Sequence, residues 1–174
     1  MIIHHIGIFS YLYTKRALYH EQYKLMINGR FLPPMYLFTA LASMVLLQFF
    51  LPVYQLIFYP WNAAGIIPLS LGMALNIIAD RAFKKTGTTV KPFEVSTTLI
   101  TSGVFRYSRN PMYLGMVLIL AGVAFLLGAL SPFIIIPVYA ITMDRVFIAS
   151  EEYMLDERFG KRWRQYRTKV RRWI

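Results

Sequence analysis

The sequence contains no cysteine, which removes several kinds of chemistry at the outset. Without a thiol the chain forms no disulfide, binds no metal through thiolates and has no cysteine nucleophile. Histidine is scarce as well, and its three copies, His4, His5 and His20, lie close to the start of the chain. Because no fourth ligand candidate stands near them, we expect no metal site.

Charge is also in short supply, and acidic charge most of all. Only 16% of the 174 residues are charged and 57% are hydrophobic, a composition too apolar for a soluble domain. The surplus of Lys and Arg gives a net charge of +11. These basic residues flank apolar runs and gather at the chain end, so we expect anionic lipid headgroups as partners and no nucleic acid. The sequence therefore indicates an integral membrane protein.

Apolar runs long enough to cross a bilayer follow one another along the chain. A hydrocarbon core of roughly 30 Å requires about 20 helical residues. The candidate spans cover about residues 35–58, 63–79, 112–130 and 133–150. Pro52 predicts a kink in the first, and Ser131-Pro132 predicts a tight helical hairpin between the last two. We expect one all-α domain over residues 1–174 with four transmembrane helices.

A stripe of small residues marks one face of the second span. Gly65, Gly72 and Ala79 are spaced seven apart, which places them on one side of a helix. Small residues at such positions allow another helix to approach closely, so we expect a tight helix contact there.

The distribution of Lys and Arg supports an even number of spans. Basic residues lie before the first span, between the second and third, and from Arg158 onward, whereas the two short loops on the opposite side contain none. By the positive-inside rule, both termini and the loop over residues 80–109 face the cytoplasm.

Both ends of the chain have an interfacial character. Residues 1–13 are apolar but too short to span, and they lack a basic n-region, so we expect an interfacial segment. Over residues 151–174 apolar side chains recur every three or four positions and basic ones fill the other face. This pattern predicts a C-terminal amphipathic helix at the cytoplasmic surface.

The first candidate site is a polar run at the entrance of the third span. Residues 97–113 combine hydroxyl side chains, Arg106 and Arg109 with an Asn110-Pro111 helix start. Free backbone N–H groups at a helix N-terminus, together with arginines, suit a polar or anionic ligand. A structural alternative is that Asn110 caps the helix, Pro111 occupies its first turn and both arginines meet lipid phosphates.

The second candidate site lies at the inner end of the fourth span. Asp144 and Glu151 are seven residues apart, as are Arg145 and Glu152, so each pair would share a helix face. Ionisable groups at this depth usually face the protein interior or a water-filled cavity. The alternative is an ordinary interfacial helix end in which Asp144 and Arg145 pair with neighbours. Carboxylates beside arginines suit a zwitterionic ligand.

Both regions contain motif residues at consistent spacing. Leu99, Thr101, Gly103 and Phe105 precede Arg109-Asn110-Pro111-Met112-Tyr113-Leu114-Gly115, and Glu151-Glu152 precede Phe159-Gly160 and Tyr166. Over residues 95–174 this pattern resembles the isoprenylcysteine carboxyl methyltransferase and phospholipid methyltransferase superfamily of integral-membrane enzymes. The resemblance implies methyl transfer from S-adenosylmethionine to a membrane-embedded or amphiphilic acceptor, namely a lipid amine, a prenylcysteine-like carboxylate or a small thiol.

The resemblance also implies which residues form the site. The residues expected to bind the cofactor are Thr97, Thr98, Leu99, Ile100, Phe105, Asn110, Pro111, Met112, Tyr113 and Glu151. The residues expected to act in catalysis are Arg109, Asn110 and Arg145. The residues expected to position the cofactor are Arg109, Asn110, Tyr113 and Glu151, while Arg145 or Arg106 would orient an anionic acceptor.

Two positions depart from the superfamily pattern. The histidine of its Arg-His-Pro element is Asn110 here, which hydrogen-bonds but does not titrate near neutral pH, so no general-base role is expected. Prenylcysteine methyltransferases have an arginine four residues before the first glutamate, where this chain has Phe147. This second departure argues against a prenylcysteine acceptor.

Two other functions remain open. Membrane sterol and steroid reductases have a similar arrangement of Arg, His-Pro and Tyr but bind NADPH, and the Glu151-Glu152 pair followed by Phe159-Gly160 favours the methyltransferases. A non-enzymatic four-helix membrane protein or transporter would be expected to carry an ionisable group in mid-span, whereas the interiors of the first three spans are uncharged. No glycine-rich dinucleotide fingerprint is present, so the cofactor assignment rests on the resemblance.

Overall fold

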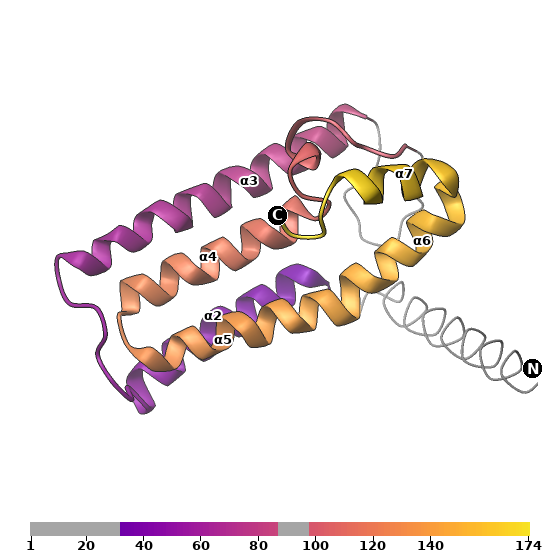
Figure 1. The fold of residues 1–174 in the computed structure, drawn as a ribbon. Helices are drawn as coiled ribbons and strands as arrows, with labels where there is room; N and C mark the ends of the chain where they lie inside the picture. The colour runs from indigo at the N-terminus through magenta and orange to yellow at the C-terminus, as the bar shows by residue number, and fades with distance from the viewer. Residues whose placement is uncertain (1–31, 87–97) are drawn as a thin grey trace, which may run out of the picture.

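The computed structural model describes residues 32–86 and 98–174, and these ranges are helical without a strand, as the sequence predicts (Figure 1). An isolated bridge between Gln55 and Ala129 is the extended pairing found there. Several sequence expectations lie outside the described residues: the interfacial segment over residues 1–13, the three histidines, and Thr97.

The helices are separated by short connections. They are α2 (Pro33–Phe50), η1 (Trp61–Gly65), α3 (Ile66–Lys85), η2 (Gly103–Arg106), α4 (Pro111–Leu127), α5 (Leu130–Thr142), the π-helical turn η3 (Met143–Ile148), α6 (Ala149–Phe159) and α7 (Lys161–Lys169). Three continuous stretches, Pro33–Phe50, Trp61–Lys85 and Leu130–Phe159, are long and apolar enough to cross a membrane. Helix α4 is a shorter apolar helix.

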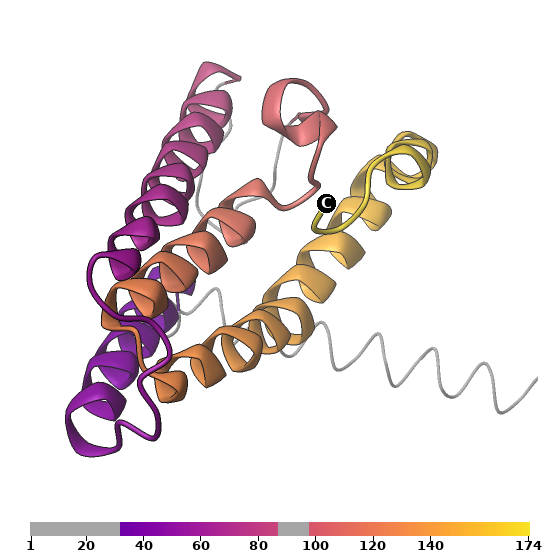
Figure 2. The same ribbon diagram turned by 60° about the vertical axis from the view of Figure 1, so that its left-hand side comes forward.

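Helix α4 forms the centre of the bundle. Helix α3 packs along one side of it, while α2 and α5 pack on the other side and against each other (Figures 1 and 2). Met44 of α2, Leu120 of α4 and Met143 of η3 are fully buried where these elements meet. Much of the outer surface of α2, α3 and α5 is apolar and exposed, as expected for helices that face lipid.

The contact between α3 and α4 depends on glycine. A Cβ atom on Gly72 would lie 2.5 Å from the carbonyl oxygen of Gly115, and one on Gly65 would lie 2.5 Å from that of Gly122. Both distances are far below van der Waals contact, so only glycine permits this approach of the two backbones. Gly65, Gly72 and Ala79 are buried, as expected for the small-residue stripe.

We expect Gly72→Ala to lower the free energy of unfolding by about 1–3 kcal/mol, because the added methyl group overpacks a rigid backbone contact. Ala74→Val adds more volume on the exposed side of α3 and serves as the control. Thermal unfolding in detergent micelles measures the effect. Equal midpoints for both variants and the wild type would contradict the close α3–α4 contact.

The end of the first predicted span differs from the structure. We expected a helix over residues 35–58 with a kink at Pro52, but α2 ends at Phe50. Leu51 leaves the helical region (φ −145°, ψ 61°), since the residue before proline disfavours the α conformation. The chain then crosses the α4–α5 turn, where the backbone N–H groups of Leu56 and Ile57 donate to the carbonyl oxygen of Gly128 at 2.8 and 3.0 Å.

The turn between α4 and α5 also lies earlier than expected. We expected the third span to reach residue 130 and Ser131-Pro132 to form the turn, but α4 ends at Leu127. Gly128 adopts a left-handed conformation (φ 76°) and its N–H donates to the carbonyl oxygen of Ala124 at 2.9 Å. Glycine in this conformation is a common helix terminator, and proline is tolerated in the first turn of the helix that follows. Ser131 and Pro132 therefore lie inside α5.

The C-terminal region is not the single amphipathic helix that we expected. Helix α6 continues directly from η3, and Gly160 (φ 48°) then turns the chain so that α7 runs back toward the start of α4 (Figure 1). The apolar side chains of Trp163, Tyr166 and Val170 pack on Leu99, Leu155 and Phe159. The apolar face of α7 is thus buried against protein, and mainly basic side chains face outward.

Candidate functional site

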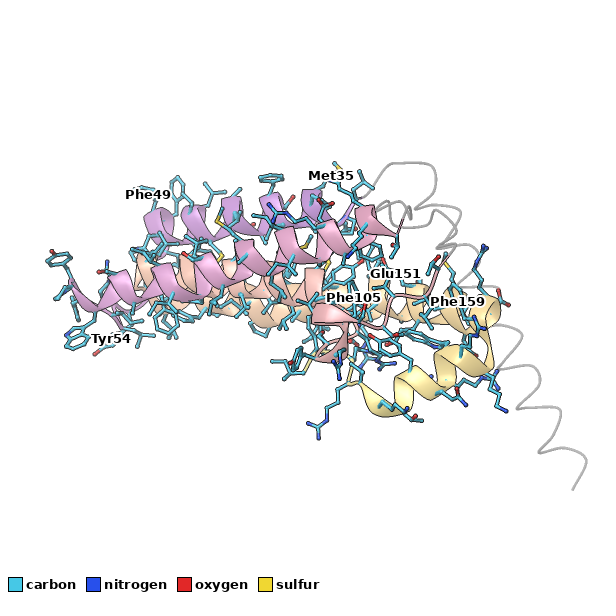
Figure 3. The ribbon with its side chains drawn as sticks, turned by 90° about the horizontal axis from the view of Figure 1, so that it is seen from above. Met35, Phe49, Tyr54, Phe105, Glu151 and Phe159 are labelled. Atoms are coloured by element: carbon cyan, nitrogen blue, oxygen red, sulfur yellow. The ribbon has the colours of Figure 1, made fainter. Side chains whose placement is uncertain are left out.

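The candidate site lies where the N-terminal end of α4, η3, α6 and the last residues of the chain meet. Figure 3 shows Glu151, Phe105 and Phe159 at this end of the molecule, with Phe49 and Tyr54 at the opposite end. Segments far apart in the sequence converge here because α7 folds back along α6.

Asn110 precedes α4 but its side chain does not cap the helix. Its Nδ2 group donates instead to the backbone oxygen of Arg172 at 3.0 Å, and its backbone N–H donates to Ser108 Oγ at 3.1 Å. Pro111 occupies the first turn, as the structural alternative proposed. The amide of Asn110 therefore joins the start of α4 to the C-terminal tail.

Arg109 is buried, with 8% of its side chain exposed. Its Nη2 lies 3.1 Å from Glu152 Oε1, and the guanidinium lies over the ring of Trp163, 5.5 Å from the centroid. Its Nε and Nη1 have no hydrogen-bond partner among the described residues. Burial lowers the pKa of the Arg109 guanidinium, against the opposing effect of Glu152. The alternative that this arginine meets lipid phosphates does not fit its burial.

Arg172 completes the ion cluster from the C-terminal tail, and sequence reasoning missed it. Its Nη2 donates to Glu152 Oε2 at 2.6 Å, its Nε donates to Glu152 Oε1 at 3.2 Å, and its Nη1 lies 3.0 Å from both oxygens of Asp144. The hydrogen bond with Glu152 raises the pKa of Arg172. Trp173 Nε1 donates to Asp144 Oδ1 at 3.3 Å.

The charged side chains do not lie on the shared helix faces that the seven-residue spacing predicted. Asp144 and Glu152 share Arg172, whereas the side chain of Arg145 is 82% exposed and lies 4.0 Å from Asp144. The physical reason is η3, because a π-helical turn holds more residues per turn than an α-helix and shifts the faces of α5 and α6 relative to each other.

Glu151 forms a second polar contact beside the ion cluster. Tyr113 donates its hydroxyl to Glu151 Oε1 at 2.7 Å. The Tyr113 ring packs against Phe147, which is fully buried and contacts Tyr36 edge-on at 5.3 Å between centroids. Phe147, which stands where prenylcysteine methyltransferases have arginine, is therefore part of the core that supports Tyr113.

The other predicted site residues surround this centre unevenly. Phe105 is buried, packs edge-on against Phe83, and accepts a hydrogen bond from Tyr166 at its backbone oxygen at 2.6 Å. Leu99 packs on the Trp163 cluster, Ile100 and Met112 are half-buried, and Thr98 is exposed. The structure thus joins Arg109 to Glu152 and Tyr113 to the adjacent Glu151. It leaves Arg106 exposed and Arg145 at the outer edge of the ion cluster.

The positive and negative charges of the ion cluster balance, and its remaining polar groups indicate what it can bind. Arg109 and Arg172 offset Asp144 and Glu152. Two donors of Arg109 have no partner within residues 32–86 and 98–174, and Glu151 adds a carboxylate nearby. Buried donors without acceptors suit an anionic group, and an additional carboxylate suits a cation or hydroxyl groups. The arrangement fits a ligand that carries both.

Comparison with known proteins places the chain in a family. The phospholipid methyltransferase family matches residues 61–162, which extend from η1 into α7. An uncharacterized protein of Haemophilus influenzae is 35% identical over 63 residues, corresponding to 36% of this chain and 100% of the relative. No solved structure matches the chain. The family match confirms the resemblance, and with the apolar helices it shows that the chain is an integral membrane protein belonging to the phospholipid methyltransferase family.

Proposed function

We propose that the protein transfers a methyl group from S-adenosylmethionine to a membrane-embedded or amphiphilic acceptor, namely a lipid amine, a prenylcysteine-like carboxylate or a small thiol. The observation that carries the proposal is that two buried donors of Arg109, within the ion cluster, have no partner in the described part of the chain, and that the chain belongs to a methyltransferase family.

The residues present fit the cofactor chemically. Arg109 Nε and Nη1 suit its carboxylate, and the Glu151 carboxylate, held by Tyr113, suits its ammonium group or ribose hydroxyls. When bound, S-adenosylmethionine supplies a methyl group that is already activated by the sulfonium. A nicotinamide cofactor also has ribose hydroxyls, but it carries neither an ammonium group for Glu151 nor a carboxylate for Arg109.

The role of the chain is to orient reactants and exclude water. We infer that Arg109 and Glu151 hold the donor while Asn110 and Tyr113 fix these two groups through the tail and through hydrogen bonding. Alignment for in-line displacement contributes most of the rate, since the leaving group needs no further activation. Asn110 takes no proton, because an amide does not titrate near neutral pH.

The proposal includes four transmembrane helices, with α4 as the fourth beside the three longer stretches. Helix α4 is central and protected by its neighbours, so a crossing of about 25 Å at 1.5 Å per residue is sufficient. Both termini and the site lie on the cytoplasmic side, in accordance with the basic residues. The donor then enters from the cytoplasm and the acceptor from the bilayer, and the exposed basic residues of α7 meet anionic headgroups.

Calorimetric titration of the purified protein with S-adenosylhomocysteine and, separately, with NADPH tests the proposal. We expect binding of S-adenosylhomocysteine alone, followed by transfer of labelled methyl groups to a lipid or thiol acceptor in nanodiscs. Binding of NADPH alone would assign the protein to the reductase alternative. Binding of neither compound to folded protein would contradict both enzyme functions.

A further inference from the structure

The C-terminal tail contributes more to the site than a packing contact. The backbone oxygen of Arg172 accepts hydrogen bonds from Asn110 Nδ2 at 3.0 Å and from Ser108 Oγ at 3.4 Å. The backbone N–H of Arg109 donates to the backbone oxygen of Arg171 at 3.1 Å. The tail is therefore fixed in register with the segment that carries Arg109.

We propose that Arg172 is a positioning residue that keeps Nε and Nη1 of Arg109 available for the carboxylate of the methyl donor. This inference rests on the proposed function. It assigns a role to a residue that does not itself contact the ligand but acts through Glu152.

Arg172 occupies both carboxylate oxygens of Glu152. Arg172 takes Oε2 of Glu152 at 2.6 Å and also reaches Oε1 at 3.2 Å, so Arg109 reaches Oε1 alone, through Nη2. An arginine beside an uncontested carboxylate prefers two parallel hydrogen bonds. Without Arg172, Arg109 would turn to satisfy both oxygens of Glu152 and would use a donor that the ligand requires.

A second anchor prevents Arg172 from moving aside. Its Nη1 lies 3.0 Å from both oxygens of Asp144, and Trp173 Nε1 also donates to Asp144. The rigid, planar guanidinium thus bridges η3 and α6 in one geometry. A lysine at this position supplies the charge but not the two-sided fork.

The charge of Arg172 also helps to keep Arg109 available for the carboxylate of the methyl donor. The formal charges of Arg109, Arg172, Asp144 and Glu152 sum to zero, so the donors of Arg109 are not neutralised by a surplus of carboxylates. Removal of Arg172 leaves the cluster negative, which disfavours a ligand carboxylate beside Arg109.

The test uses two methyl donors that differ only in the carboxylate, S-adenosylmethionine and its decarboxylated form. We expect the wild type to bind the first at least about tenfold more tightly, as is typical of a charge-assisted hydrogen-bonded pair. In Arg172→Met this preference is expected to fall to about twofold or less, while the affinity for the decarboxylated donor stays nearly constant. Arg171→Met, which removes an exposed neighbouring side chain and keeps the backbone contact, is the control.

Further variants keep the result interpretable. Arg172→Lys provides the same readout if the methionine variant fails to fold, and we expect it to lose most of the preference. In the double variant Arg109→Met/Arg172→Met, loss of Arg172 should have no additional effect on the preference, because the residue acts through Arg109.

The outcomes separate this inference from the proposed function. A folded Arg172 variant that retains the full preference for S-adenosylmethionine would overturn the positioning role. So would a variant that loses affinity equally for S-adenosylmethionine and its decarboxylated form. Either result would leave the proposed methyl transfer intact. A wild type that binds both donors equally would also overturn the positioning role. A wild type that binds neither donor would instead contradict the proposed function.

Discussion

Glu152→Gln is expected to lower the free energy of unfolding by about 3–5 kcal/mol, the cost of removing one partner from a buried ion pair. Glu152 is 8% exposed on its side chain and accepts from both Arg109 and Arg172. A glutamine leaves these two guanidinium groups close together with one carboxylate, Asp144, on the far side of Arg172. Thermal unfolding in detergent, followed by circular dichroism, measures the loss.

Two controls isolate the effect of charge in this prediction. Glu157→Gln is the same substitution on the exposed part of α6 and is expected to change stability little. The double variant Glu152→Gln/Arg172→Met restores formal neutrality and should recover part of the loss. If Glu152→Gln unfolds at the same temperature as Glu157→Gln, the buried cluster does not stabilise the fold.

Motif residues are the part of the candidate site that the sequence placed in two segments which meet in the structure, and their roles stay predictions. Arg109, Tyr113 and Glu151 were chosen for their spacing within two short segments, and the structure brings these segments together. The two segments meet because each borders an apolar helix, whose position is set by hydrophobic burial and by helix-starting residues such as Pro111.

Arg172 could not be predicted in the same way. The tail contains many basic residues, and nothing in their spacing distinguishes the one that turns inward from those that face outward. Its position follows from the reversal at Gly160, where the backbone adopts a φ of 48°. One sequence signal was that the carboxylates of Asp144 and Glu152 need a basic partner near the membrane surface. Arg145 is closer in the sequence and met that requirement equally well.

The sequence pattern also did not reveal where the regular α-helices are interrupted. The length of the uncharged run predicted that the first helix continues through Pro52, and the seven-residue spacing predicted that Asp144 and Glu151 share a helix face. Both predictions assume a regular α-helix. The structure ends α2 before the proline and inserts η3 between α5 and α6. A π-helical turn leaves no clear mark in a single sequence, yet it rotates Asp144 toward the tail and Arg145 away from it.

Arg109→Met is expected to weaken binding of S-adenosylhomocysteine by about 100-fold, because the ligand carboxylate loses a buried, charged partner with two donors. The fold should survive, since Arg172 still pairs with Glu152 and methionine fills the space over Trp163. Arg106→Met is the matched control, as it removes an exposed arginine from the same loop and should bind normally.

Arg109→Lys sharpens this last comparison. Lysine retains the positive charge but is a point donor that cannot serve Glu152 and a carboxylate through a planar fork, so we expect an intermediate loss of about tenfold or more. Isothermal titration of all three variants, with unfolding midpoints as the check on folding, gives the order wild type and Arg106→Met, then Arg109→Lys, then Arg109→Met. Wild-type affinity in folded Arg109→Met would show that the N–H groups of Arg109 do not bind S-adenosylhomocysteine. The carboxylate of the ligand would then have to meet backbone N–H groups at the start of α4 instead.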